Sequence, residues 1–109
     1  MSEATLEERG FKPACAISEV PTMLPRKVSI DGLSVLICRG EEGFFAVDEL
    51  CPHKSLSMAF GVVHEGKIIC PHHQYTFDLD TGRCSMRRCA PVNTYPVEVV
   101  GEELFVKIG

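Results

Sequence analysis

Hydrophobic and polar residues alternate over short stretches of this chain, and glycine or proline separates most of the stretches. Most of them are rich in β-branched and aromatic residues, which is typical of strands. Eight stretches are predicted to be strands: 11–16, 26–30, 33–39, 44–48, 67–70, 75–79, 95–100 and 104–108. Many short strands spaced by turn residues predict an all-β protein with an antiparallel β-sandwich or barrel.

Turn residues indicate how neighbouring strands are joined. The Asp-Gly pair at 31–32 is a strong signal for a two-residue hairpin. Residues 80–82 (Asp-Thr-Gly) are expected to end a strand, and residues 101–103 (Gly-Glu-Glu) are expected to join the last two strands. The only helix expected is about one turn at 17–20, which Pro21 stops because proline cannot continue a helix.

The composition is that of one folded domain. Of the 109 residues, 45% are hydrophobic and 24% are charged, which is ordinary for a globular protein and argues against disorder. Residues 1–10 are acidic and contain no apolar run, so they do not resemble a secretory signal. We predict a flexible N-terminus at 1–10 and a single domain at 11–109.

Charge and hydropathy argue against two classes of partner. A net charge of −4 disfavours nucleic acid, whose phosphates require a basic surface. No stretch approaches 18 consecutive apolar residues, so no membrane span is expected and the protein is predicted to be soluble and cytoplasmic. In a reducing compartment, six cysteines are better explained by metal binding or burial than by a disulfide framework.

Two predicted loops, 51–61 and 70–75, interrupt the strands and hold most of the potential metal ligands. Three of the four histidines and two of the six cysteines lie in these loops, in the patterns Cys51-x-His53 and Cys70-x-x-His73. Thiolate is a soft ligand that suits iron–sulfur clusters or zinc, and imidazole suits iron, zinc or copper. Both loops follow strand ends, so we expect their tips to approach each other.

Two kinds of metal centre fit one sulfur and one nitrogen ligand from each loop. A binuclear cluster can place both cysteines on one iron and both histidines on the other, which is the Rieske arrangement. A single zinc ion also accepts two cysteines and two histidines. However, zinc sites usually show C-x₂₋₄-C and H-x₃₋₅-H spacings, and neither occurs among these four residues.

The motifs of the chain closely resemble those of the Rieske family. The matching features are C-P-H at 51–53, Gly61 ten residues after the first cysteine, C-P-x-H at 70–73, F-D-L-D-T-G at 77–82, Pro91, and the closing strands. The similarity runs from about Phe11 to the C-terminus. It implies a Rieske-like fold with a small cluster-binding subdomain of two loops. It also implies one Rieske-type 2Fe-2S cluster held by Cys51, His53, Cys70 and His73.

The remaining histidines and cysteines are expected to have simpler roles. The family's C-x-x-H spacing selects His73, so the adjacent His72 is expected to face solvent rather than to dock a partner. His64 is expected to be solvated in a turn. Four further cysteines are expected to behave as small hydrophobes: Cys15, Cys38, Cys84 and Cys89. The alternative is a redox or second metal role.

The resemblance further implies a ferredoxin that passes electrons from a flavin-dependent reductase to a terminal oxygenase, in particular an aromatic-ring-hydroxylating dioxygenase. Both partners would dock transiently. The chain has no room for the separate mononuclear iron domain of an oxygenase, so it is expected to be an electron-transfer component and not an enzyme by itself. The alternatives are the small subunit of an assimilatory nitrite reductase and a non-catalytic, cluster-bearing sensor or structural module.

Overall fold

The computed structural model describes residues 6, 8–40, 43–52, 56–71, 75–85 and 90–108. Over these residues the predicted all-β fold is confirmed. The elements in chain order are β1 (Phe11–Ala16), the 3-10 helix η1 (Ile17–Glu19), β2 (Arg26–Ile30), β3 (Leu33–Gly40), β4 (Gly43–Asp48), β5 (Val62–His64), β6 (Lys67–Ile69), β7 (Thr76–Asp78), β8 (Thr94–Tyr95), β9 (Val97–Val100) and β10 (Glu103–Lys107). In the described part of the chain, no helix has the length and apolar character needed to cross a bilayer.

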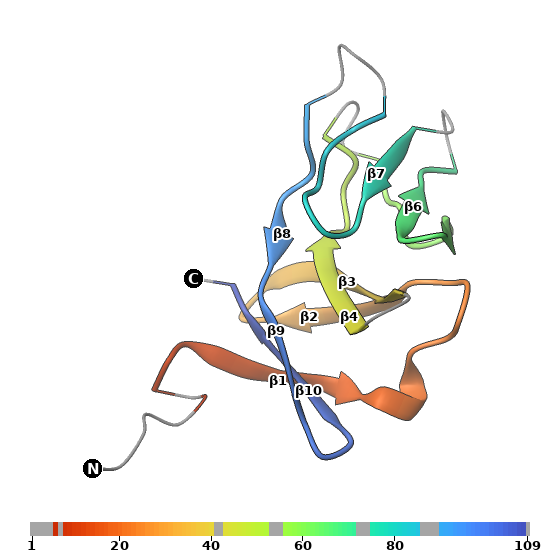
Figure 1. The fold of residues 1–109 in the computed structure, drawn as a ribbon. Helices are drawn as coiled ribbons and strands as arrows, with labels where there is room; N and C mark the ends of the chain where they lie inside the picture. Colours follow the sequence, from red (N-terminus) through yellow and green to blue (C-terminus); the bar gives the residue numbers. More distant parts are fainter. Residues whose placement is uncertain are drawn as a thin grey trace.

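The strands form three antiparallel sheets. Their strand orders are β1-β10-β9, β2-β3-β4-β8 and β5-β6-β7. Figure 1 shows the two larger sheets crossing in the lower part of the molecule, with the small β5-β6-β7 sheet above them. The described parts of the predicted loops 51–61 and 70–75 lie at this upper end. The small sheet and the described parts of the two loops therefore lie together at one end of the fold.

Strand β3 is buried on both faces and links two hydrophobic cores. Val35 and Ile37 pack into a core between the two larger sheets, together with residues of β1, β2 and β10. Leu36 and Cys38 point the other way and pack against the small sheet. Successive side chains of a strand alternate between its faces, so a strand between two cores needs an unbroken apolar run. This explains the continuous hydrophobic stretch in β3.

Cys15 and Cys38 are core residues, as predicted. Cys38 is fully buried, and burial raises the pKa of its thiol to about 12. Burial is also the main cause that raises the pKa of Cys15. Since the thiolate is the nucleophile and the metal ligand, both groups stay protonated and unreactive at neutral pH.

The structure corrects the prediction that placed His64 in a turn. His64 is the last residue of β5, a strand that the sequence pattern did not reveal, and its side chain is exposed as expected. The turn consists of Glu65 and Gly66, whose φ angles of 50° and 76° match those of the predicted Asp31-Gly32 hairpin, 51° and 85°. Glutamate is uncommon at such a position, so this hairpin carried little local signal.

The predicted strand 95–100 is divided in two at Pro96. Tyr95 ends β8, which pairs with β4, and Val97 begins β9, which pairs with β10. Proline has no N–H to donate to a sheet, so the chain loses no sheet hydrogen bond from this residue when it changes its partner strand here.

Asp48 anchors β8 beside the strand that leads to Cys51. Its carboxylate accepts hydrogen bonds from Tyr95 OH (2.5 Å) and Asn93 Nδ2 (2.9 Å), and its N–H donates to the Asn93 carbonyl (3.1 Å). Burial, followed by the hydrogen bond to Asp48, raises the pKa of Tyr95 to about 12.

This raised pKa predicts a loss of stability in alkali. Tyrosine in the unfolded chain ionises near pH 10, so the contribution of Tyr95 is complete below about pH 10 and is lost as the pH rises through about 12. Between these values, the free energy of unfolding should fall more steeply for the unchanged protein than for Tyr95→Phe. Urea unfolding of both proteins from pH 9 to 12 measures the difference, and equal slopes would contradict the prediction.

Candidate metal centre

Cys51 and Cys70 begin two loops that are closed in the same way. The Cys51 N–H donates to the Leu56 carbonyl (2.8 Å), and the Cys70 N–H donates to the Tyr75 carbonyl (2.7 Å). Each hydrogen bond joins residues five positions apart and so closes a short loop at its base. One loop follows β4, and the other connects β6 to β7.

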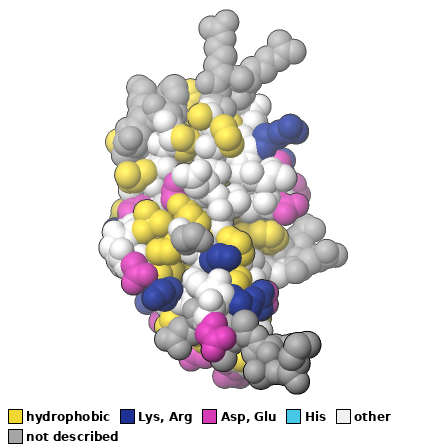
Figure 2. All heavy atoms as spheres, turned by 90° about the vertical axis from the view of Figure 1, so that its left-hand side faces the viewer, with side chains coloured by type: hydrophobic (Ala, Val, Ile, Leu, Met, Phe, Trp, Pro, Cys, Tyr) yellow, Lys and Arg dark blue, Asp and Glu magenta, His cyan; other side chains and the backbone are white. Residues whose placement is uncertain are grey.

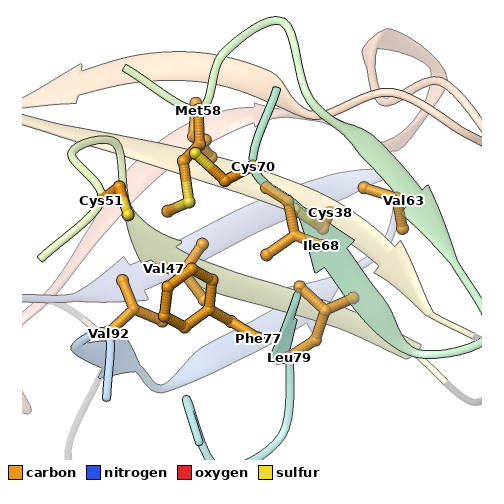
Figure 3. Close-up of a cluster of buried hydrophobic side chains, with 11 residues drawn as sticks. Cys38, Val47, Cys51, Met58, Val63, Ile68, Cys70, Phe77, Leu79 and Val92 are labelled. Carbon is orange, nitrogen blue, oxygen red and sulfur yellow. The ribbon is translucent and has the colours of Figure 1, made fainter. Parts of the chain in front are cut away.

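The two cysteines lie in the same buried cluster, although 19 positions separate them in the chain. Cys51 and Cys70 are at most 1% exposed, and both belong to the core between the β2-β3-β4-β8 sheet and the small sheet. Figure 3 shows Cys51, Met58 and Cys70 next to one another at one end of this core. The fold therefore brings together the two sulfur ligands predicted from the sequence and shields them from water.

Glu49 connects the two ends of the first loop. Its backbone carbonyl accepts the Met58 N–H (2.8 Å), and its carboxylate accepts the Ser57 hydroxyl (2.7 Å). The Ser57 oxygen in turn accepts the Ala59 N–H (3.1 Å), and the Lys27 ammonium lies 3.2 Å from the same carboxylate. The hydrogen bond from Ser57 is the largest cause that lowers the pKa of Glu49.

Gly61 allows the first loop to contact the strand that leads into the second. Its N–H donates to the Met58 carbonyl (2.9 Å). A Cβ at position 61 would lie 2.4 Å from the Ile69 carbonyl oxygen, which is closer than real Cβ atoms come to other atoms, and 3.0 Å from that of Met58. Because Ile69 directly precedes Cys70, this close approach helps to hold the two cysteine-bearing segments together.

The structure does not place the predicted histidine ligands or two other residues considered above. His53, His72, His73 and Cys89 lie outside the described residues. Within the residues that are described, no three His, Cys, Asp or Glu side chains are grouped to hold a metal ion. Ligation by His53 and His73 therefore stays a prediction. Cys84 is half-buried and packs against the core that contains Cys51 and Cys70, as expected for a small hydrophobe.

Sequence reasoning did not identify Glu49, Ser57 or Met58 as parts of this site. An acidic residue at a strand end is usually exposed, so the burial of Glu49 has no local signal. Met58 is an ordinary apolar residue in a loop. The chemistry of the described donors nevertheless fits one half of a Rieske ligand set, because two shielded thiols lie side by side at the bases of two loops.

A family comparison agrees with this site. The model of the Rieske 2Fe-2S domain matches residues 10–96. The chain belongs to the Rieske 2Fe-2S domain family, whose cofactor is one Rieske-type cluster.

Individual relatives of this chain are ferredoxins of dioxygenase systems. The chain is 33% identical over 99 residues to the ferredoxin component of a naphthalene 1,2-dioxygenase system from Pseudomonas aeruginosa, covering 87% of this chain and 92% of the relative. It is 32% identical to the anthranilate 1,2-dioxygenase ferredoxin subunit of Burkholderia cepacia, with both chains fully covered. It also resembles a structure of the complex between reduced oxygenase and oxidised ferredoxin in carbazole 1,9a-dioxygenase. That likeness has a TM-score of 0.80 and 27% identity, over 90% of this chain and 93% of the matched one.

Proposed function

We propose that this protein is the ferredoxin of an aromatic-ring-hydroxylating dioxygenase system, which accepts electrons from a flavin-dependent reductase and passes them to a terminal oxygenase. The observation that carries the proposal is the pair of buried cysteines at the bases of two equivalent loops. The two relatives described above are ferredoxins of such systems. When bound, the cluster supplies a reversible one-electron site. The chain would be an electron-transfer component and not an enzyme by itself, and its predicted cytoplasmic location stays a prediction.

We assign the cluster ligands to Cys51, His53, Cys70 and His73. The cysteine side is enclosed by the core, since Met58 and both cysteines are at most 1% exposed. Electrons would therefore have to leave on the side of the histidines. Glu49 and Ser57 would keep the first loop in place by joining its two ends.

Metal analysis tests the cofactor. The purified protein should contain two irons and two acid-labile sulfides per chain, with no stoichiometric zinc. One zinc ion and no sulfide would contradict the proposal.

Electron transfer tests the role within a dioxygenase system. The reduced protein, mixed without oxygen with the terminal oxygenase of the naphthalene or anthranilate system, should be oxidised as the oxygenase is reduced. The ferredoxin of each system serves as the positive control. If both controls transfer electrons and this protein reduces neither oxygenase, the dioxygenase role is wrong. Transfer to an assimilatory nitrite reductase would then support the alternative, and no transfer to either enzyme would support a sensor or structural module.

A further inference from the structure

Phe60 is 87% exposed, the highest value among the large hydrophobic side chains in the described residues. Isolated apolar residues are common on protein surfaces, so exposure alone indicates no function. The position of Phe60 is what distinguishes it. It lies in the first loop, between the buried Met58 and strand β5, close to the candidate metal centre.

The turn that carries Phe60 is held firmly on both sides. Met58 anchors it in the core, and the Gly61 N–H donates to the Met58 carbonyl (2.9 Å). Gly61 itself packs closely against the backbone of Ile69, the residue before Cys70. A large side chain presented by a constrained turn can be buried by a partner with little loss of backbone entropy.

Other exposed apolar residues lie in β5 or next to it. Val62 is on the solvent side of this strand, and Met23 lies along it, because the Val63 N–H donates to the Met23 carbonyl (2.8 Å). Leu24 follows and is also half-exposed. We call the four exposed residues the apolar rim: Met23, Leu24, Phe60 and Val62. Residues 56–63 contain no charged side chain.

Outside the apolar rim, the described residues include three further exposed large hydrophobic side chains: Leu50, Val99 and Val100. Figure 2 shows acidic and basic side chains interspersed with apolar ones on the face that carries β8. Val99 and Val100 are exposed as well, but they lie beside the β9–β10 turn, at the lower end of the molecule in Figure 1. The small sheet and the two cysteine-bearing segments are at the upper end.

We propose that the apolar rim, with the highly exposed Phe60, is the surface on which the terminal oxygenase docks. This inference rests on the proposed function. A partner that accepts an electron has to approach the end of the molecule that holds Cys51 and Cys70, and a partner in contact with that end covers the adjoining rim. The oxygenase is the occupant because the structurally similar ferredoxin with 27% identity is found in a complex with an oxygenase. Its matching surface would be an uncharged, apolar recess, which Phe60 would fill as a buried aromatic anchor.

The test measures oxygenase reduction with three variants. The probe is whichever of the naphthalene and anthranilate oxygenases the unchanged protein reduces. Phe60→Ala should raise the KM for the ferredoxin about tenfold and leave kcat nearly unchanged, because an aromatic anchor acts through association. Phe60→Leu should recover most of the loss. Val100→Ala is the matched control at the distant end and should have no effect.

Three further measurements show whether Phe60→Ala weakens docking or damages the metal site: the reduction potential, the visible spectrum and the unfolding midpoint. All three should be the same in Phe60→Ala as in the unchanged protein, because the side chain is almost entirely exposed. An unchanged KM in Phe60→Ala would overturn the docking surface while the proposed function stands. Slower reduction by the reductase, with normal transfer to the oxygenase, would also overturn it. If the unchanged protein reduces neither oxygenase, the proposed function fails and the docking surface fails with it.

Discussion

Replacement of Cys70 by alanine is expected to abolish binding of the 2Fe-2S cluster. The variant lacks one of the two thiolates that are predicted to hold the sulfur-ligated iron. Cys38→Ala is the matched control, because Cys38 is equally buried in the same hydrophobic core. It should keep the cluster and lose only about 1 kcal/mol of unfolding free energy, the typical cost of a small deletion in a core.

Iron and acid-labile sulfide per chain, together with the visible spectrum, measure the outcome. Loss of iron from both variants would mean that core packing, and not ligation, controls cluster retention. A second matched pair tests the ligands that lie outside the described residues. His73→Ala should strip the iron and His72→Ala should retain it, and the reverse result would show that the fourth ligand is His72.

Replacement of Gly82 by alanine is expected to cause a large loss of stability, about 3–5 kcal/mol. Gly82 has a φ angle of +77°, which disfavours any residue with a Cβ. A Cβ at this position would also lie 2.1 Å from the Val92 carbonyl oxygen. The Gly82 N–H donates to the Asp78 carbonyl, and its own carbonyl accepts the Val92 N–H, so the backbone has little freedom to move away.

Gly66→Ala separates the two causes. Gly66 has nearly the same φ angle, +76°, but no atom lies within 4 Å of its hypothetical Cβ. Its replacement should therefore cost only the conformational penalty, about 1–2 kcal/mol. Urea unfolding of both variants gives the difference. Equal losses would indicate that the contact between Gly82 and Val92 relaxes without cost.

Local patterns in the sequence were sufficient for most of the fold. Strands β1 and β2 have the predicted bounds, and Asp31-Gly32 forms the predicted hairpin turn. These features depend on side-chain alternation and on backbone preferences within a few residues, which can be read directly from the chain. β5 was not predicted, because its three residues show no clear period and the Glu65-Gly66 turn after it carries little local signal, so its pairing with β6 decides its structure.

The sequence by itself also determined the family and the candidate ligands, because the spacing of cysteine and histidine within each loop is a local property. Only the tertiary structure decided that Cys51 and Cys70 meet in one core, that β3 divides two cores, and that Glu49 joins the two ends of the first loop. The same holds for Gly61 and Gly82, which are needed because distant backbone segments approach them closely. Such contacts arise from how sheets pack against each other, and residues far apart in the chain give no local pattern from which that packing can be predicted.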